Sequence, residues 1–170
     1  MVDPLGSPVV LDASVLINLI ATEVPGELLE SLDVDVVVRE QAWSEVTRDP
    51  RGRGPPALVL DPLRAAGNLS VVPLEGVALA TFMELVSAPS PDDLGDGESA
   101  TIAHAVASGW AAALDDKKAI RILRARSPTT RQIYTVDIFA LAKAKSSLSA
   151  KVVDQAFDDA LRFARMRVPK

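Results

Sequence analysis

The stretch LGDGESATIAHAVASGWAAALDDKKA, Leu94 to Ala119, decides the fold. It predicts a Gly-rich turn, then a helix stopped by Gly109, since a glycine just past the last helical residue is a common stop signal. A short buried strand, Trp110–Leu114, should follow, and two carboxylates, Asp115 and Asp116, end it. In an open α/β sheet, ligands bind at the carboxyl ends of the strands. The stretch therefore predicts both a fold and the edge where a site would lie.

Outward from this stretch, apolar runs alternate with segments of helical period. The expected strands are Pro8–Asp12, Val34–Val38, Leu69–Pro73, Trp110–Leu114 and Gln132–Thr135. Such alternation predicts βαβ units with right-handed crossovers. We therefore expect one domain over residues 1–170, an α/β/α sandwich with a mostly parallel sheet of about five strands. Ser14 should N-cap the first helix, and Lys151–Met166 should form one final amphipathic helix.

Composition narrows the class of protein. The chain has 170 residues, of which 48% are apolar, with one histidine and no cysteine. The lack of cysteine excludes disulfides and thiolate chemistry. The N-terminus has no basic region, and Asp12 interrupts its apolar run. We therefore expect neither a signal peptide nor a membrane span, but a soluble cytoplasmic protein.

Charge is unevenly distributed along the chain. Residues 1–116 carry 5 Lys/Arg and 19 Asp/Glu, whereas residues 117–151 carry 9 Lys/Arg and a single Asp. An acidic protein with one concentrated basic segment can bind a polyanion locally. A solvated helix face would give the same pattern, so charge alone does not decide between the two interpretations.

Five acids are candidates for chemistry: Asp12, Glu45, Glu98, Asp115 and Asp116. A doubly wound sheet would gather Asp12, Glu98 and the Asp115/Asp116 pair near one edge, and Glu45 joins them if its helix begins there. Carboxylates that lie close together raise one another's pKa unless a cation neutralises them. Ligation by oxygen alone suits Mg²⁺ or Mn²⁺, which orients a phosphodiester and lowers the pKa of a water molecule. Any one of these acids could equally be a helix cap, a turn residue or a partner of a helix dipole. Their conjunction favours a metal site.

Four blocks, in this order, resemble PIN-domain proteins: VVLDASVLINL (9–19), SEV (44–46), LGDGESATIAHA (94–105) and LDDKKAIRIL (114–123). The last two resemble the subgroup with a Gly-Glu-Gly-Glu-type motif followed by an Asp-Asp-Lys/Arg block, which includes toxin nucleases. The resemblance runs from about residue 8 to about residue 165. It implies a metal-dependent ribonuclease on an α/β/α sandwich. Many members are VapC-like toxins that pair with an antitoxin and form homodimers.

The resemblance also implies roles for particular residues. Asp12, Glu45 and Glu98 match the first three acids of the family, and the last acid is Asp115 or Asp116. Alignment on the following Lys-Lys favours Asp116, whereas alignment on the strand end favours Asp115. The metal ligands would be Asp12, Glu98 and one of this pair, with all five acids candidates for catalysis.

Substrate contacts are expected from Ser14, Arg51, Arg53 and Lys117. Ser14 could touch a water molecule on the metal in addition to capping its helix. The three cations flank the proposed acids in sequence, and a basic rim is needed because carboxylates repel phosphate. The chain departs from the family at residues 134–137, Tyr-Thr-Val-Asp, where relatives often have a Gly-Thr-Leu-Gly-like turn.

The sequence thus predicts a metal-dependent endoribonuclease that hydrolyses the phosphodiester bonds of RNA, the toxin of a toxin–antitoxin pair, acting as a homodimer. A housekeeping RNA-processing nuclease and a catalytically silent PIN-like interaction module are the alternatives. A phosphoacceptor receiver domain would need an early acidic pair. A haloacid-dehalogenase-like phosphatase would need Asp-x-Asp, whereas this chain reads Asp12-Ala13-Ser14.

Overall fold

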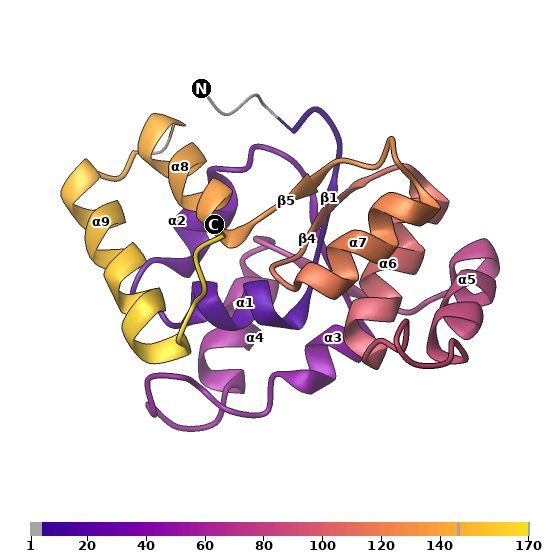
Figure 1. Ribbon diagram of the computed structural model, residues 1–170. Coiled ribbons are helices and arrows are strands. Elements are labelled where there is room, and N and C mark those ends of the chain that lie inside the picture. The colour runs from indigo at the N-terminus through magenta and orange to yellow at the C-terminus, as the bar shows by residue number, and fades with distance from the viewer. Residues whose placement is uncertain (1–4, 146, 170) are drawn as a thin grey trace.

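A computed structural model describes residues 5–145 and 147–169, and its centre is a five-stranded sheet (Figure 1). The strand order is β3-β2-β1-β4-β5 and every pair is parallel, which confirms the predicted α/β fold. The strands are β1 (Val9–Leu11), β2 (Val36–Arg39), β3 (Ser70–Val72), β4 (Ala111–Ala113) and β5 (Gln132–Ile133).

Helices connect and cover these strands. They are α1 (Ala13–Ile20), α2 (Pro25–Glu30), α3 (Glu40–Glu45), α4 (Ala57–Ala65), α5 (Gly76–Val86), α6 (Asp96–Ser108), α7 (Lys117–Arg126), α8 (Thr135–Lys145) and α9 (Ala150–Asp159), and the π-helical turn η1 (Ala160–Ala164) continues α9. Gly109 ends α6 in the left-handed conformation, φ 71°, as its sequence position predicts. None of the helices in the described ranges is long and apolar enough to cross a membrane.

The sheet separates two hydrophobic layers. Val9 and Leu11 pack with α1, α2, α8 and α9 on one face, and Val10 packs with α5, α6 and α7 on the other (Figure 1). Successive side chains of a strand point to opposite faces, so a strand buried on both sides has to be apolar throughout. All three residues of β1 are fully buried, as this arrangement requires.

The chain changes direction across the sheet at β1. It passes from β1 outward to β2 and β3, then returns to the other side of β1 as β4 and continues to β5. Leu11 is in register with Ala113, and the backbone N–H of Asp12 donates to the carbonyl of Ala113 at 3.1 Å. This is a topological switch point, where the connections after neighbouring strands diverge and leave space for a ligand.

Two expectations about helix ends are wrong. Asp12, not Ser14, caps α1, because the helix already begins at Ala13 and the Ser14 N–H needs an acceptor, which is the Asp12 carboxylate at 3.2 Å. The final helix does not run to Met166. After α9 it widens into η1 and ends at Arg165, whose left-handed backbone (φ 57°) turns the chain away from the helix axis.

Two arginines hold the loop between α3 and α4. Arg53 donates to both carboxylate oxygens of Asp49, at 2.8 and 2.9 Å, and to the Ile20 carbonyl at 2.6 Å. These hydrogen bonds lower the pKa of Asp49 to about 2. Arg51 pairs with Asp159 at 2.9 Å, and its guanidinium lies 4.5 Å from the centre of a phenylalanine ring in η1. The loop is thereby tied to the end of α1 and to the C-terminal helix.

Candidate functional site

The five candidate acids come from four segments at the carboxyl edge of the sheet. Asp12 follows β1, Glu45 ends α3, Glu98 lies in the first turn of α6, and Asp115 and Asp116 follow β4. Three of them, Glu98, Asp115 and Asp116, line a cavity of about 340 Å³, which we call the acid cavity. The parallel sheet and the start of α6 therefore bring together residues that lie more than 100 positions apart in the sequence.

Asp12 is the buried member of the group, only 3% exposed. One carboxylate oxygen accepts from the Ser14 hydroxyl at 2.6 Å, while the other is buried and has no hydrogen-bond partner among the described residues. Burial raises the pKa of Asp12, and the charge of Asp115 raises it further, whereas the Ser14 bonds lower it. Ser14 itself lines the acid cavity. A buried, unpaired carboxylate oxygen costs stability unless something neutralises it.

The two adjacent aspartates have different partners. Asp115 accepts from the Asn18 side-chain amide at 2.9 Å, from the Thr135 backbone N–H at 2.9 Å and from the Thr135 hydroxyl at 2.6 Å. Asp116 caps α7, with one oxygen accepting from two backbone N–H groups of the first turn at 2.8 and 2.9 Å. Asp115 is thus held on both oxygens by neutral donors, whereas the helix cap uses a single oxygen of Asp116.

Glu45 reaches the site through the turn that begins α6. Its carboxylate accepts from the Gly97 N–H at 2.7 Å. A Cβ atom at Gly97 would lie 2.6–2.8 Å from the Glu45 carboxylate, closer than side-chain atoms can approach. Burial raises the pKa of Glu45, and the Gly97 hydrogen bond opposes that shift. Gly97 is therefore required so that Glu45 can dock against the start of α6.

The surroundings of Glu98 shift its pKa upward. Burial above all, together with the charges of Asp12 and Asp116, raises its pKa to about 7. Its one hydrogen bond that opposes the shift comes from the Gly95 N–H at the long distance of 3.4 Å. Close to neutral pH, Glu98 is therefore protonated in a substantial fraction of molecules unless a cation is present.

A divalent cation fits the chemistry of these donors. No three or more acidic or histidine side chains within residues 5–145 and 147–169 stand close enough together to hold a metal ion in their present rotamers. The donors are nevertheless carboxylate oxygens only, one of them buried and unpaired on Asp12, and the carboxylates repel one another. Mg²⁺ and Mn²⁺ prefer such ligands. Binding would require carboxylates to leave weak contacts such as the 3.4 Å bond between Glu98 and Gly95.

The predicted substrate contacts are divided between two places. Ser14 lines the acid cavity, and Lys117 is exposed beside Asp116 at the first position of α7. Arg51 and Arg53 instead make the intramolecular ion pairs that hold their loop. A guanidinium already paired with a carboxylate is less available to a phosphate, so their role in binding RNA stays a prediction.

Sequence reasoning missed several residues at the site. Asn18 and Thr135 hold Asp115, and Arg165 and Arg167 line the acid cavity. Asn18 could have been found, because it is a polar residue inside an otherwise apolar helix. Thr135 lies in the segment where this chain lacks the family's glycine-containing turn. Here the Asp137 carboxylate accepts from the Tyr134 N–H at 2.8 Å and stabilises the chain between β5 and α8.

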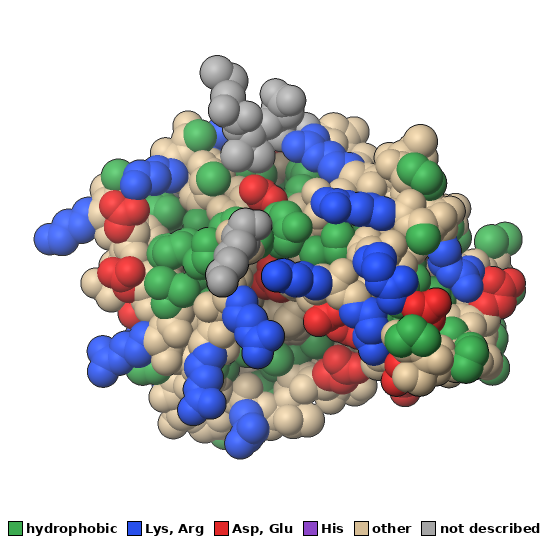
Figure 2. Space-filling model, in the orientation of Figure 1, with side chains coloured by type: hydrophobic (Ala, Val, Ile, Leu, Met, Phe, Trp, Pro, Cys, Tyr) green, Lys and Arg blue, Asp and Glu red, His purple; other side chains and the backbone are tan. Residues whose placement is uncertain are grey.

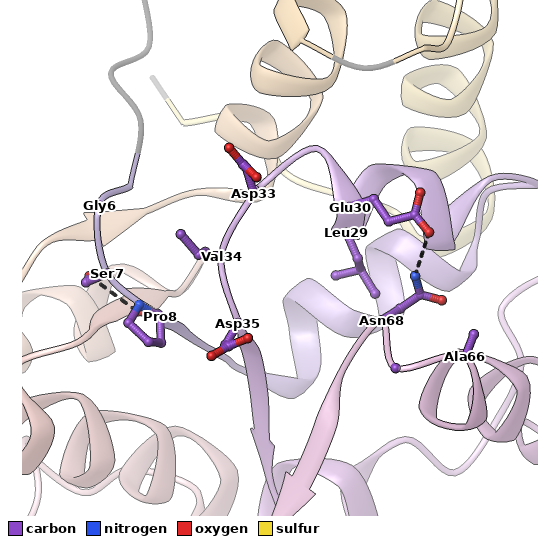
Figure 3. Close-up of a pocket in the computed structure, with 11 residues that line it drawn as sticks. Gly6, Ser7, Pro8, Leu29, Glu30, Asp33, Val34, Asp35, Ala66 and Asn68 are labelled. Atoms are coloured by element: carbon purple, nitrogen blue, oxygen red, sulfur yellow. Dashed lines mark hydrogen bonds between the residues drawn. The ribbon is translucent and has the colours of Figure 1, made fainter.

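A second cavity, of about 690 Å³, lies at the opposite edge of the sheet (Figure 3). Its lining includes Pro8, Asp35 and Asn68, which precede β1, β2 and β3. Asn68 donates to Glu30 there at 3.0 Å. None of the five candidate acids lines this cavity. The amino ends of the strands are not where a doubly wound sheet binds ligands, so the acid cavity is the better candidate site.

Replacing Glu98 by Gln should stabilise the protein at pH 8 but hardly at pH 4. The pKa of Glu98 in the folded protein, about 7, exceeds its ordinary value of 4.5, so the folded state binds the proton more tightly. In the wild type, the ionisation of Glu98 therefore lowers the free energy of unfolding as the pH rises from about 4.5 through 7, whereas Gln has no proton to lose. We expect Glu98→Gln to raise the free energy of unfolding by about 1–2 kcal/mol at pH 8. This is less than the free energy that corresponds to the full pKa shift, because water screens this half-buried group. Urea unfolding at both pH values measures it.

The exposed Asp61→Asn, on α4, is the matched control for the loss of one negative charge. An equal effect of Glu98→Gln at pH 4 and pH 8 would contradict the assignment of a raised pKa to Glu98.

Comparison with known proteins agrees with this geometry. A family described as a PIN domain matches residues 8–170, nearly the whole chain. No curated protein and no solved structure matches the chain. The match covers the five acids and both walls of the acid cavity, and PIN domains are generally nucleases. The chain belongs to the PIN-domain family.

Proposed function

We propose that this PIN domain is a Mg²⁺- or Mn²⁺-dependent endoribonuclease that hydrolyses phosphodiester bonds of RNA. One observation carries the proposal: mutually repelling carboxylates, including a buried Asp12 with an unpaired oxygen, gather at the carboxyl edge of the sheet. Such a group is unfavourable by itself and becomes favourable when a divalent cation neutralises it. RNA as the substrate rests on the resemblance of the four sequence blocks to PIN-domain ribonucleases.

Asp12, Glu98 and one of the two adjacent aspartates would hold the cation. We favour Asp116 as that ligand, because its helix cap uses one oxygen, whereas both oxygens of Asp115 accept hydrogen bonds. Glu45 would border the site from α3. When bound, the cation supplies charge neutralisation, polarises a phosphodiester oxygen and lowers the pKa of a water molecule.

The remaining residues prepare the carboxylates for this role. Ser14 donates to Asp12 and so favours its ionised form against the effect of burial. Asn18 and Thr135 fix the orientation of Asp115. The Gly97 N–H fixes Glu45. Because the donors are neutral, they orient the carboxylates without competing with a cation for the negative charge.

A role as the toxin of a toxin–antitoxin pair is the finer proposal, supported by the resemblance of the third and fourth blocks to toxin nucleases. A short antitoxin gene immediately upstream would favour it, whereas its absence would favour a housekeeping RNA-processing nuclease. A catalytically silent interaction module is the non-enzyme alternative. It is disfavoured because such a module would have no need to retain five acids that repel one another.

The protein should cleave single-stranded RNA when Mg²⁺ or Mn²⁺ is present and lose that activity in EDTA. Asp12→Asn should lower the cleavage rate by about 100-fold or more, because it removes the buried charge that a cation would meet. Gel analysis of end-labelled RNA measures both effects. Asp61→Asn, far from the acid cavity on α4, should cleave at the wild-type rate. Undiminished cleavage by Asp12→Asn, or in EDTA, would sink the proposal.

Gly97→Ala should reduce cleavage without unfolding the protein. The new Cβ would displace only the flexible end of Glu45, so the acid moves although no charge is removed. Misplacement of this size costs about 10- to 100-fold in rate. Gly95→Ala is the matched control, since its Cβ would meet nothing closer than 3.9 Å. Cleavage rates and thermal unfolding of both variants give the comparison, and equal rates would show that the position of Glu45 is unimportant.

We further propose that the protein is a homodimer. The support is that α5 exposes apolar side chains, with Val77 72%, Leu79 44% and Met83 55% exposed. Two copies of the chain that pack about a two-fold axis at α5 would cover such side chains. Light scattering should give twice the 18.0 kDa chain mass, and Val77→Glu should reduce it toward one chain. A single-chain mass for the wild type at high micromolar concentration is the contrary result.

A further inference from the structure

The C-terminal segment Arg165–Arg167 lines the acid cavity together with Glu98, Asp115 and Asp116. The left-handed backbone of Arg165 turns the chain out of η1, and the Met166 N–H returns a hydrogen bond to the Ala160 carbonyl at 3.2 Å. The Met166 side chain is buried in the main hydrophobic core, 6% exposed. The segment is thus fastened at its middle residue.

An exposed arginine lies on each side of this anchor. The side chains of Arg165 and Arg167 make no hydrogen bond or ion pair with any residue of the described part of the chain. Arg165 also borders an adjoining cavity of about 640 Å³ that includes Glu45 and Arg48. Figure 2 shows Lys and Arg side chains facing Asp and Glu side chains around a hollow on the face that carries the C-terminus. Two guanidinium groups that have no partner among the described residues therefore line the acid cavity.

These two arginines differ from the pair that the sequence singled out. Arg51 is held by Glu23 and Asp159, at 2.6 and 2.9 Å, and Arg53 is held by Asp49. Their donors are already satisfied by the protein. The donors of Arg165 and Arg167 are left for a ligand, and a planar guanidinium matches the oxygens of a phosphate.

We propose that Arg165 and Arg167 bind the phosphate backbone of single-stranded RNA and hold it over the acid cavity. The proposal rests on the proposed function, because it supplies the substrate contacts that a nuclease site of carboxylates lacks. An extended backbone rises by at most about 3.3–3.6 Å per residue, so the two arginines lie close enough to engage neighbouring phosphates of one strand. The contacts are with the backbone and therefore do not depend on base sequence.

The test compares Arg165→Gln/Arg167→Gln with Arg64→Gln/Lys151→Gln. Both pairs remove two exposed positive charges, but Arg64 and Lys151 lie on α4 and α9 and line neither cavity. Each pair is made in the Asp12→Asn background, which prevents cleavage, and binding of a fluorescein-labelled single-stranded RNA is followed by anisotropy from 50 to 200 mM salt. Between about 50 and 200 mM salt, affinity that depends on contacts with phosphates falls steeply, so the slope can be measured.

The Arg165/Arg167 variant should bind RNA about 10-fold more weakly at low salt. Its plot of log Kd against log salt should be flatter by about 1.4, the value for two lost contacts to a single strand. The Arg64/Lys151 variant should match Asp12→Asn alone. Thermal unfolding of each variant, with Met166 retained as the anchor, shows that the segment is still folded against the core.

Unchanged affinity and slope in the Arg165/Arg167 variant would overturn the inference. Tighter RNA binding, or faster cleavage by the same substitutions in the active protein, would also overturn it and would show that the arginines close the cavity against RNA. If one of these results is found and the wild type still cleaves RNA, the proposed function stands and only this inference fails. If the wild type neither binds nor cleaves RNA, both fail.

Discussion

The hydrogen bond from the Asp12 N–H to the Ala113 carbonyl, 3.1 Å long, is the constraint on which the site depends. It extends the parallel pairing of β1 with β4, in which Leu11 is in register with Ala113. Because a strand rises by about 3.3 Å per residue, the acids immediately beyond this pairing cannot lie far apart. The other acids then have to reach this one point, from the end of α3 and the start of α6.

Gathering carboxylates in this way opposes folding. Burial and like charges raise the pKa of Asp12 and of Glu98, which means that the folded state disfavours their ionised forms. Hydrogen bonds from Ser14 to Asp12 and from the Gly95 N–H to Glu98 reduce the cost only in part. Two apolar layers, one on each face of the sheet, have to outweigh it. A site that is unstable when empty and complete only with a ligand is the usual form of a functional site.

The sequence alone determined the fold class and the positions of the five acids along it. Apolar runs such as Val9–Leu11 alternate with helical periods, and local signals such as Gly109 mark their ends, because strand and helix periods are properties of neighbouring residues. The order of four short blocks was enough to predict PIN-domain membership, which the family match over residues 8–170 confirms. It also placed Asp12, Asp115 and Asp116 at the ends of strands, where a doubly wound sheet forms its sites.

Only the tertiary structure decided which partners these residues have, because partners come from distant segments. It assigned Arg51 and Arg53 to ion pairs within the protein and left Arg165 and Arg167 at the acid cavity, although all four are arginines. The end of the last helix likewise became visible only in the structure, at the left-handed backbone of Arg165. Residue type and spacing specify what a side chain can do, whereas its burial and neighbours decide whether its charge is already satisfied.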